Sequence, residues 1–117
     1  MPAWLHEGIA QLLEPKSLGS DGRQLAQLFK TQRNIPLNVL EGSFLNFSGG
    51  QAYLAYAESL ATVSYINDSY GMGDIQRILQ RLSQGSSTEA ALRATIHSDY
   101  GALESEVGKY LSDKYGD

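Results

Sequence analysis

The stretch SGGQAYLAYAESLATVSYINDSYG, residues 48–71, decides the fold of this chain. Ser48 and Gln51 have the spacing of a capping box, which satisfies the first unpaired amides of a helix. Gly71 follows as a typical helix stop. Apolar residues lie on two sides, with Tyr53, Tyr56, Leu60, Val63 and Tyr70 on one and Leu54, Ala61 and Tyr65 on the other. A helix that is apolar on two sides is typical of the centre of a core, so we predict a central helix over roughly residues 50–70.

Further helices are predicted on both sides of this one. Their approximate ranges are 4–14, 23–32, 73–84, 90–97 and 99–115. No alternating strand pattern of useful length and no internal repeat is visible. The sequence therefore predicts an all-α fold of five or six helices, with residues 1–117 forming a single helical domain.

Local signals indicate where the outer helices begin and end. The core stripe of the first helix is predicted to be Leu5, Ile9, Leu12 and Leu13. Pro15 is expected to stop that helix, because proline cannot continue the hydrogen-bond ladder. Ser20 or Asp21 lies near the start of the second helix. Ser86 and Glu89 have capping-box spacing ahead of residues 90–97.

Composition excludes several classes of protein. Hydrophobic residues make up 42% of the chain and charged residues 19%, which is normal for a soluble globular domain. No apolar run approaches the roughly 20 residues of a membrane-spanning helix. The absence of cysteine excludes disulfides, thiolate zinc sites and cysteine nucleophiles. The net charge is −4 and no run of Lys and Arg forms a phosphate-binding stripe, so nucleic acid is not an expected partner. The localisation is not indicated.

Residues 2–14, PAWLHEGIAQLLE, place two carboxylates on one helix face. At about 100° per residue, Glu7 and Glu14 fall opposite the predicted core stripe. Ala3 and Ala10 share their face, where small side chains would let another helix approach closely. Spacing alone favours an ordinary solvated face, because acidic side chains are rarely buried.

The order of these residues gives information that their spacing alone does not. PAWLHEGIAQLLE resembles the segment Trp-Leu-x-Glu-Gly-x-Ala-x-x-x-Glu of the gluzincin zinc metallopeptidases, and is nearest to the bacterial peptidase MA-like domains. In that superfamily one helix carries His-Glu-x-x-His, whose histidines bind zinc and whose glutamate is the general base, and a following helix supplies a third ligand. The resemblance implies that Glu7 is this third zinc ligand. It also implies that Gly8 and Ala10 keep the two helices close, and that Glu14 contacts and orients the ligands.

Later segments resemble the helical tail of the same domains. YLAYAESLATVSYINDSYG, residues 53–71, is similar to their central helix, and LQRLSQGSSTEAALRAT, residues 79–95, to their Leu-x-x-Leu-x-x-Gly-x-x-x-x-Glu-Ala-Leu segment. Related gluzincins use a Tyr or His of this tail to donate to the oxyanion, so the resemblance implies that role for Tyr56 or Tyr53. From the residues alone, both are core aromatics with a solvated hydroxyl.

The chain departs from the family in one respect: it contains no His-Glu-x-x-His. A catalytic zinc needs three protein ligands and an open position for water, and this chain offers Glu7 alone. We therefore expect the C-terminal helical part of a gluzincin-type zinc peptidase, with Met1 an added or internal start. The complete protein would hydrolyse a peptide or protein substrate through a zinc-activated water. The alternative is a non-catalytic helical interaction module that keeps the metallopeptidase-like scaffold.

Several expectations follow for the chain by itself. It should bind no zinc and cleave no peptide. Its uncovered first helix, with Trp4 exposed, should favour self-association through residues 2–14. His6 is interpreted as a surface residue, because it and Glu7 diverge by about 100° on a helix. His97 is interpreted as capping a helix C-terminus, and Gly71-Met72-Gly73 as helix punctuation rather than a phosphate loop.

Overall fold

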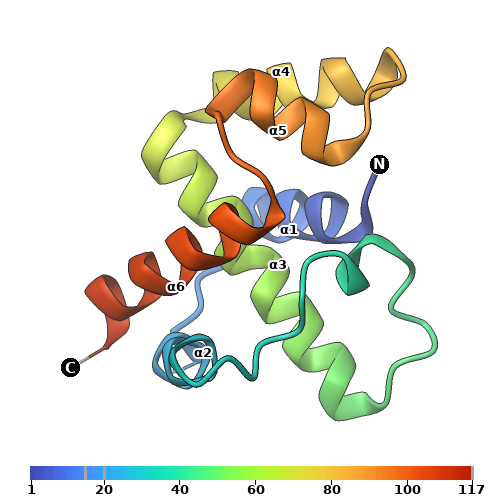
Figure 1. Ribbon diagram of the computed structural model, residues 1–117. Helices are drawn as coiled ribbons and strands as arrows, with labels where there is room; N and C mark the ends of the chain where they lie inside the picture. The colour runs from blue at the N-terminus through green and yellow to red at the C-terminus, as the bar shows by residue number, and fades with distance from the viewer. Residues whose placement is uncertain (15, 20, 117) are drawn as a thin grey trace.

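The computed structural model describes residues 1–14, 16–19 and 21–116, and over these ranges it contains helices and no strand. The helices, in chain order, are α1 (Ala3–Leu13), α2 (Asp21–Lys30), the short 3₁₀ helix η1 (Val39–Glu41), α3 (Gly49–Tyr70), α4 (Met72–Ser83), α5 (Thr88–Ile96) and α6 (Tyr100–Tyr115). The prediction of an all-α fold is confirmed. Figure 1 shows α4 and α5 as a hairpin at one end of the molecule, with α1, α2 and α6 around the long α3.

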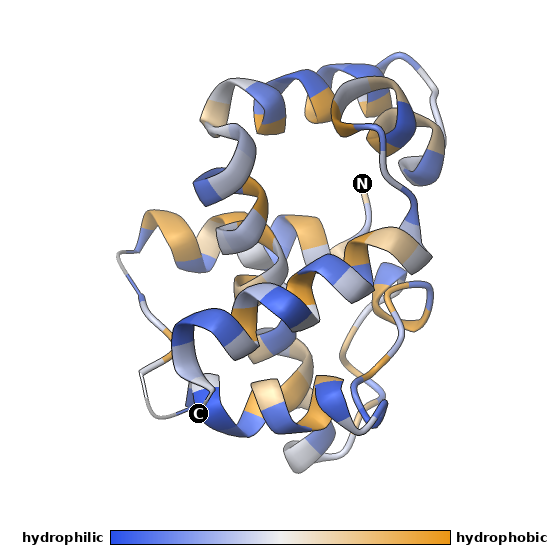
Figure 2. Ribbon diagram, turned by 60° about the vertical axis from the view of Figure 1, so that its left-hand side comes forward, coloured by the Kyte–Doolittle hydropathy of each residue, from blue (hydrophilic) through white to orange (hydrophobic). Residues whose placement is uncertain are grey.

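Helix α3 is the centre of the core, as the sequence predicts. Both bonds of the capping box form: the Gln51 amide donates to the Ser48 hydroxyl, and the Ser48 amide donates to the Gln51 side chain. Gly71 ends the helix with φ +91°. Helices α1, α2, α4 and α6 all contact α3. In Figure 2 the ribbons of α2 and α6 each carry hydrophobic and hydrophilic residues in turn, as expected of helices with one buried face.

One prediction about α3 is wrong. Tyr53, Tyr56 and Tyr70 were expected on a core-facing side, but 61%, 41% and 39% of their surfaces are exposed. The buried positions of α3 lie in its middle, from Ala55 to Ile66, where neighbouring helices cover it on several sides. Near its two ends α3 has fewer neighbours, so the same helix face is open to solvent there.

The helix boundaries differ from the sequence prediction by at most two residues, and the cap of α5 differs as well. Helix α2 begins at Asp21 rather than residue 23; Pro15 and Ser20 lie outside the described residues. Helix α5 is capped by Ser87, whose hydroxyl accepts from the Ala90 amide, and not by the predicted Ser86 and Glu89. The Ser86 amide instead donates to the Arg81 carbonyl at the end of α4. The Glu89 carboxylate accepts from the Tyr100 amide, at 2.9 Å.

Helix α1 lies on α3 in an orientation that corrects two further predictions. Its buried residues are Trp4, Leu5 and Gly8. Leu13, predicted to be in the core stripe, is 69% exposed, because the face centred on Leu5 and Gly8 turns it outward. Trp4, expected to be exposed, is fully buried. Self-association through residues 2–14 therefore cannot depend on an exposed tryptophan.

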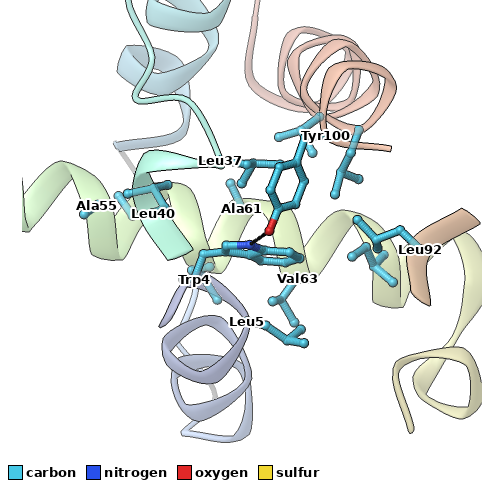
Figure 3. Close-up of a cluster of buried hydrophobic side chains, with 14 of the residues drawn as sticks. Trp4, Leu5, Leu37, Leu40, Ala55, Ala61, Val63, Leu92 and Tyr100 are labelled. Carbon is cyan, nitrogen blue, oxygen red and sulfur yellow. Dashed lines mark hydrogen bonds between the residues drawn. The ribbon is translucent and has the colours of Figure 1, made fainter. Parts of the chain in front are cut away.

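Trp4 joins four parts of the fold. Its indole N–H donates to the Tyr100 hydroxyl at 3.1 Å, and this hydroxyl donates to the Glu41 carboxylate. The two rings also meet edge to face, with centroids 6.2 Å apart. Figure 3 shows the pair alongside α3, surrounded by apolar side chains that include Leu37, Leu40, Ala61 and Val63. Helices α1 and α6 and the short η1 are thereby fixed to the central helix.

This contact leads to a stability prediction. Tyr100→Phe removes the acceptor of the buried Trp4 N–H, and an unpaired donor in the core costs ~1–2 kcal/mol. We expect a loss of this size in chemical denaturation followed by tryptophan fluorescence. Tyr56→Phe is the control, because within the described chain the Tyr56 hydroxyl makes no hydrogen bond. Equal stability of the two variants would contradict the role of the Trp4–Tyr100 bond.

Candidate functional site

A groove of about 470 Å³ lies between α1, the segment that follows it, the start of α2 and the N-terminal half of α3. It brings together three of the residues to which the family resemblance gives a role, Glu7, Glu14 and Tyr56. Nine further residues line the groove, and the resemblance indicated two of these, Ala10 and Tyr53. The rest of its lining consists of Ala10, Gln11, Lys16, Ser17, Leu18, Asp21, Tyr53, Ala57 and Leu60.

The orientation of α1 determines which side chains face this groove. At Gly8 the helix touches α3 so closely that a Cβ atom there would lie 2.3 Å from Val63 Cγ2 and 2.4 Å from the Ser59 carbonyl oxygen. Gln11 adds a direct link, because its side-chain amide donates to the Tyr56 carbonyl at 2.8 Å. With Gly8 against α3, Glu7 comes to the edge of the contact and lines the groove, and 31% of its side chain is exposed.

The groove carries more negative than positive charge. Three carboxylates line it, from Glu7, Glu14 and Asp21, against one ammonium group, from Lys16. The Lys16 ammonium lies 4.0 Å from the Glu14 carboxylate, and both side chains are mostly exposed, so this ion pair contributes little to stability. Within the described residues, no lysine or arginine forms an ion pair with the Glu7 carboxylate. The imidazole Nδ1 of His6 lies 3.4 Å from Glu7 Oε1, with 68% of the His6 side chain exposed.

The two tyrosines of the groove differ in what their hydroxyls do. The Tyr53 hydroxyl donates to Asp21 Oδ2 at 2.6 Å, and this bond and the negative charge of Asp21 raise the pKa of Tyr53. The Tyr56 ring packs edge-on against Phe44, with centroids 5.2 Å apart. Its hydroxyl makes no hydrogen bond to any described residue. Tyr56 is therefore the tyrosine whose hydroxyl remains available to a ligand in the groove.

Sequence reasoning missed Gln11 and Asp21 as parts of this site. Gln11 could have been found, because it follows Glu7 by four residues and so lies on the same side of a helix. For Asp21, the sequence indicated only a position near the start of a helix. Its place beside Tyr53 depends on how α2 packs against α3, and no local pattern indicates that packing.

The residues that the sequence predicted to be structural rather than functional have those structural roles in the fold. His97 is the C-terminal cap of α5, in a left-handed conformation with φ +55°. Gly71-Met72-Gly73 joins α3 directly to α4, and so is helix punctuation. His6 lies on α1 but does not line the groove.

The residues described here do not make a zinc site by themselves. Nowhere in residues 1–14, 16–19 and 21–116 do three side chains of His, Asp or Glu come together as a metal-binding group. The Glu7 carboxylate, with the exposed His6 imidazole beside it, falls short of the three ligands that a catalytic zinc requires. In the same ranges, no helix has the length and hydropathy to cross a membrane.

Comparison with known proteins gives one result. A family model described as Peptidase MA superfamily matches residues 1–113, nearly the whole chain. No curated protein and no solved structure matches.

Proposed function

This chain belongs to the peptidase MA superfamily, and we propose that the groove between α1 and α3 is its share of a zinc peptidase active site. In this proposal Glu7 is one of the zinc ligands, and the complete protein hydrolyses peptide bonds in a peptide or protein substrate. The observation that carries the proposal is the position of Glu7, which lines an open groove together with Glu14 and Tyr56.

The convergence of these three residues supports the proposal because their sequence positions do not require it. Glu7 and Glu14 are on α1, and Tyr56 is on α3. They share a groove because α1 contacts α3 at Gly8 and because Gln11 bonds to the backbone of Tyr56 itself. If this face of α1 were only a solvated surface, neither the close contact of Gly8 with α3 nor the bond from Gln11 to Tyr56 would be needed to orient it.

The remaining zinc ligands would come from outside these 117 residues. The expected source is a helix with His-Glu-x-x-His lying over the groove side of α1. Ala10 is exposed on that side and its small side chain leaves room for a helix to approach. Because this chain offers one carboxylate of the required three ligands, we derive no step of the reaction through the metal.

Two other groove residues take supporting roles in the proposal. Glu14 lies two helical turns beyond Glu7 and would orient the site through contacts rather than bind the metal. Tyr56 would donate its unbonded hydroxyl to the oxyanion that forms during acyl transfer. Tyr53 is less suited to that role, because its hydroxyl is already held by Asp21.

The test compares Glu7→Gln with Glu14→Gln in the protein that includes the sequence preceding residue 1 in its gene. Glu7→Gln should remove most of the bound zinc and nearly all peptidase activity, because a neutral amide is a weak ligand for a dication. Glu14→Gln should lower both much less, since it removes a contact and not a ligand. Zinc content by elemental analysis, activity on a protein substrate and circular dichroism are measured on the same samples.

Two outcomes would overturn the proposal. Equal and minor losses of zinc in the two variants would show that Glu7 is a solvated surface acid. Absence of His-Glu-x-x-His from the preceding gene sequence would favour the non-catalytic interaction module.

A further inference from the structure

A pocket of about 250 Å³ lies between α2 and α3, beside the groove between α1 and α3. On each helix its lining residues are spaced i, i+3, i+4 and i+7, so the pocket lies between two facing helix sides. The lining consists of Asp21, Gln24, Leu25 and Leu28 from α2 and Gly50, Tyr53, Leu54 and Ala57 from α3. Asp21, Tyr53 and Ala57 also line the groove, so the two cavities adjoin at these residues.

The lining of this pocket is mainly apolar. Leu25 is buried, and Leu28 and Leu54 are partly exposed. Among the described residues that line the pocket, only Asp21 is charged, and its carboxylate already accepts from the Tyr53 hydroxyl at 2.6 Å. Removing apolar surface from water is favourable and needs no charged partner. The pocket therefore suits an apolar group rather than a charged one.

The pocket stays open because α2 is held against α6 and α3 has a glycine here. Helix α2 meets α6 at two glycines: a Cβ atom at Gly22 would collide with the Tyr115 ring, and one at Gly108 would lie 3.3 Å from Phe29 Cβ. On the α3 side, a Cβ atom at Gly50 would have no other part of the described chain within 4 Å. The side of α2 that faces α3 is therefore covered only in part.

We propose that this pocket holds an apolar side chain, of the size of leucine or phenylalanine, from the peptide substrate bound in the groove between α1 and α3. The inference rests on the proposed function, because that function supplies the peptide. An apolar cavity of about 150 Å³ is enough for a benzene ring, so this pocket has room for one such side chain. Because the pocket adjoins the groove at Asp21, Tyr53 and Ala57, the side chain enters it from a main chain that stays in the groove.

Binding of small molecules to the 117-residue chain tests the pocket without zinc and without catalysis. The probe is N-acetyl-leucinamide at millimolar concentration, and its counterpart is N-acetyl-asparaginamide, whose side chain has the same branched shape but is polar. In two-dimensional NMR titrations, the leucine probe should shift the backbone amide signals of Leu25, Leu28 and Leu54. The asparagine probe should bind at least about tenfold more weakly. Equal affinity of the two probes, or absence of these shifts, would overturn the proposal.

Gly50→Leu and Gly49→Leu form a matched pair of variants. Gly50 lines the pocket and Gly49 does not, although the two are adjacent in the first turn of α3. An added Cβ would have no other part of the described chain within 4 Å at either position, so both variants should fold. Gly50→Leu narrows the pocket and should weaken binding of the leucine probe at least about tenfold, whereas Gly49→Leu should keep it within about twofold. Equal effects of the two substitutions would overturn the proposal.

Peptidase activity separates this inference from the proposed function. The protein that includes the preceding gene sequence is given peptides that differ only by leucine or asparagine, at each position in turn. At one position leucine should raise kcat/KM at least about tenfold over asparagine, and Gly50→Leu should reduce this ratio while Gly49→Leu keeps it. Hydrolysis with no such ratio at any position would overturn the pocket and leave the proposed function standing. Absence of all hydrolysis would instead overturn the proposed function, and the substrate named here with it.

Discussion

Replacing Gly8 with alanine is expected to destabilise the protein by ~3 kcal/mol or more, because it forces apart a close contact between α1 and α3. The added Cβ would lie 2.3 Å from Val63 Cγ2 and 2.4 Å from the Ser59 carbonyl oxygen. The Val63 side chain could rotate away, but the Ser59 oxygen belongs to the backbone of the central helix. Helix α1 would have to move, and Glu7 would move with it away from its place in the groove. Chemical denaturation monitored by circular dichroism measures the loss.

Gly73→Ala is the control for this prediction. Gly73 also lies within a helix, α4, but the nearest atom to an added Cβ is the end of the Arg77 side chain at 3.5 Å. Alanine is a better helix former than glycine, so this variant should gain up to ~1 kcal/mol. A Gly8→Ala protein as stable as Gly73→Ala would show that the α1–α3 contact is not the tight junction described here.

Replacing Glu58 with glutamine is expected to change how stability depends on pH. Glu58 is 1% exposed in the middle of α3, and its carboxyl group accepts from the Ile35 amide at 2.6 Å. Burial raises the pKa of Glu58 from 4.5 to about 8; the Ile35 hydrogen bond opposes this rise and the nearby charge of Glu104 adds to it. The folded protein therefore keeps Glu58 protonated at neutral pH.

The sign of the effect follows from these values. The folded state holds the Glu58 proton more tightly than the unfolded chain, so this contribution to stability is complete below pH 4.5 and is lost as the pH rises to about 8. Glutamine has no proton to lose and keeps an oxygen for the Ile35 amide. We expect Glu58→Gln to be more stable than the wild type by on the order of 3–4 kcal/mol at pH 9, with little difference at pH 4.

Denaturant titrations between pH 4 and pH 9 would measure this difference. Glu14→Gln is the control, because 67% of that side chain is exposed. It should follow the wild-type curve across the whole range. If the curves of Glu58→Gln and the wild type stayed parallel, the Glu58 carboxyl group would have an ordinary pKa and the pH dependence would come from other groups.

Much of the fold could be predicted because its signals are local. The Ser48–Gln51 capping box and the Gly71 stop are satisfied by atoms a few residues away, so the sequence specifies them without reference to the rest of the chain. The cap of α5 shows the limit of this reasoning. Ser86 and Ser87 are both good caps, and the end of α4 decides between them by using the Ser86 amide.

The candidate site could be predicted only in part. The order of residues in α1 pointed to Glu7 and Glu14, and the resemblance of α3 pointed to Tyr56. Gln11 and Asp21, which also line the groove, were not identified. Glu7, Glu14 and Tyr56 could be found because they belong to segments that resemble a family. Asp21 could not, because it lies in this groove only through the packing of α2 beside α3.

The sequence by itself determined the helices of this protein, most of their ends and its family, because hydrogen bonds within a few residues and the order of side chains are properties of the chain alone. Only the tertiary structure decided which apolar side chains are covered: Trp4 is buried, whereas Leu13 and Tyr53 are exposed. It also buried Glu58 and left a mainly apolar pocket between α2 and α3. Burial and unfilled space both depend on which surfaces neighbouring helices cover, and that is set by long-range close packing, as at Gly8 and Gly108.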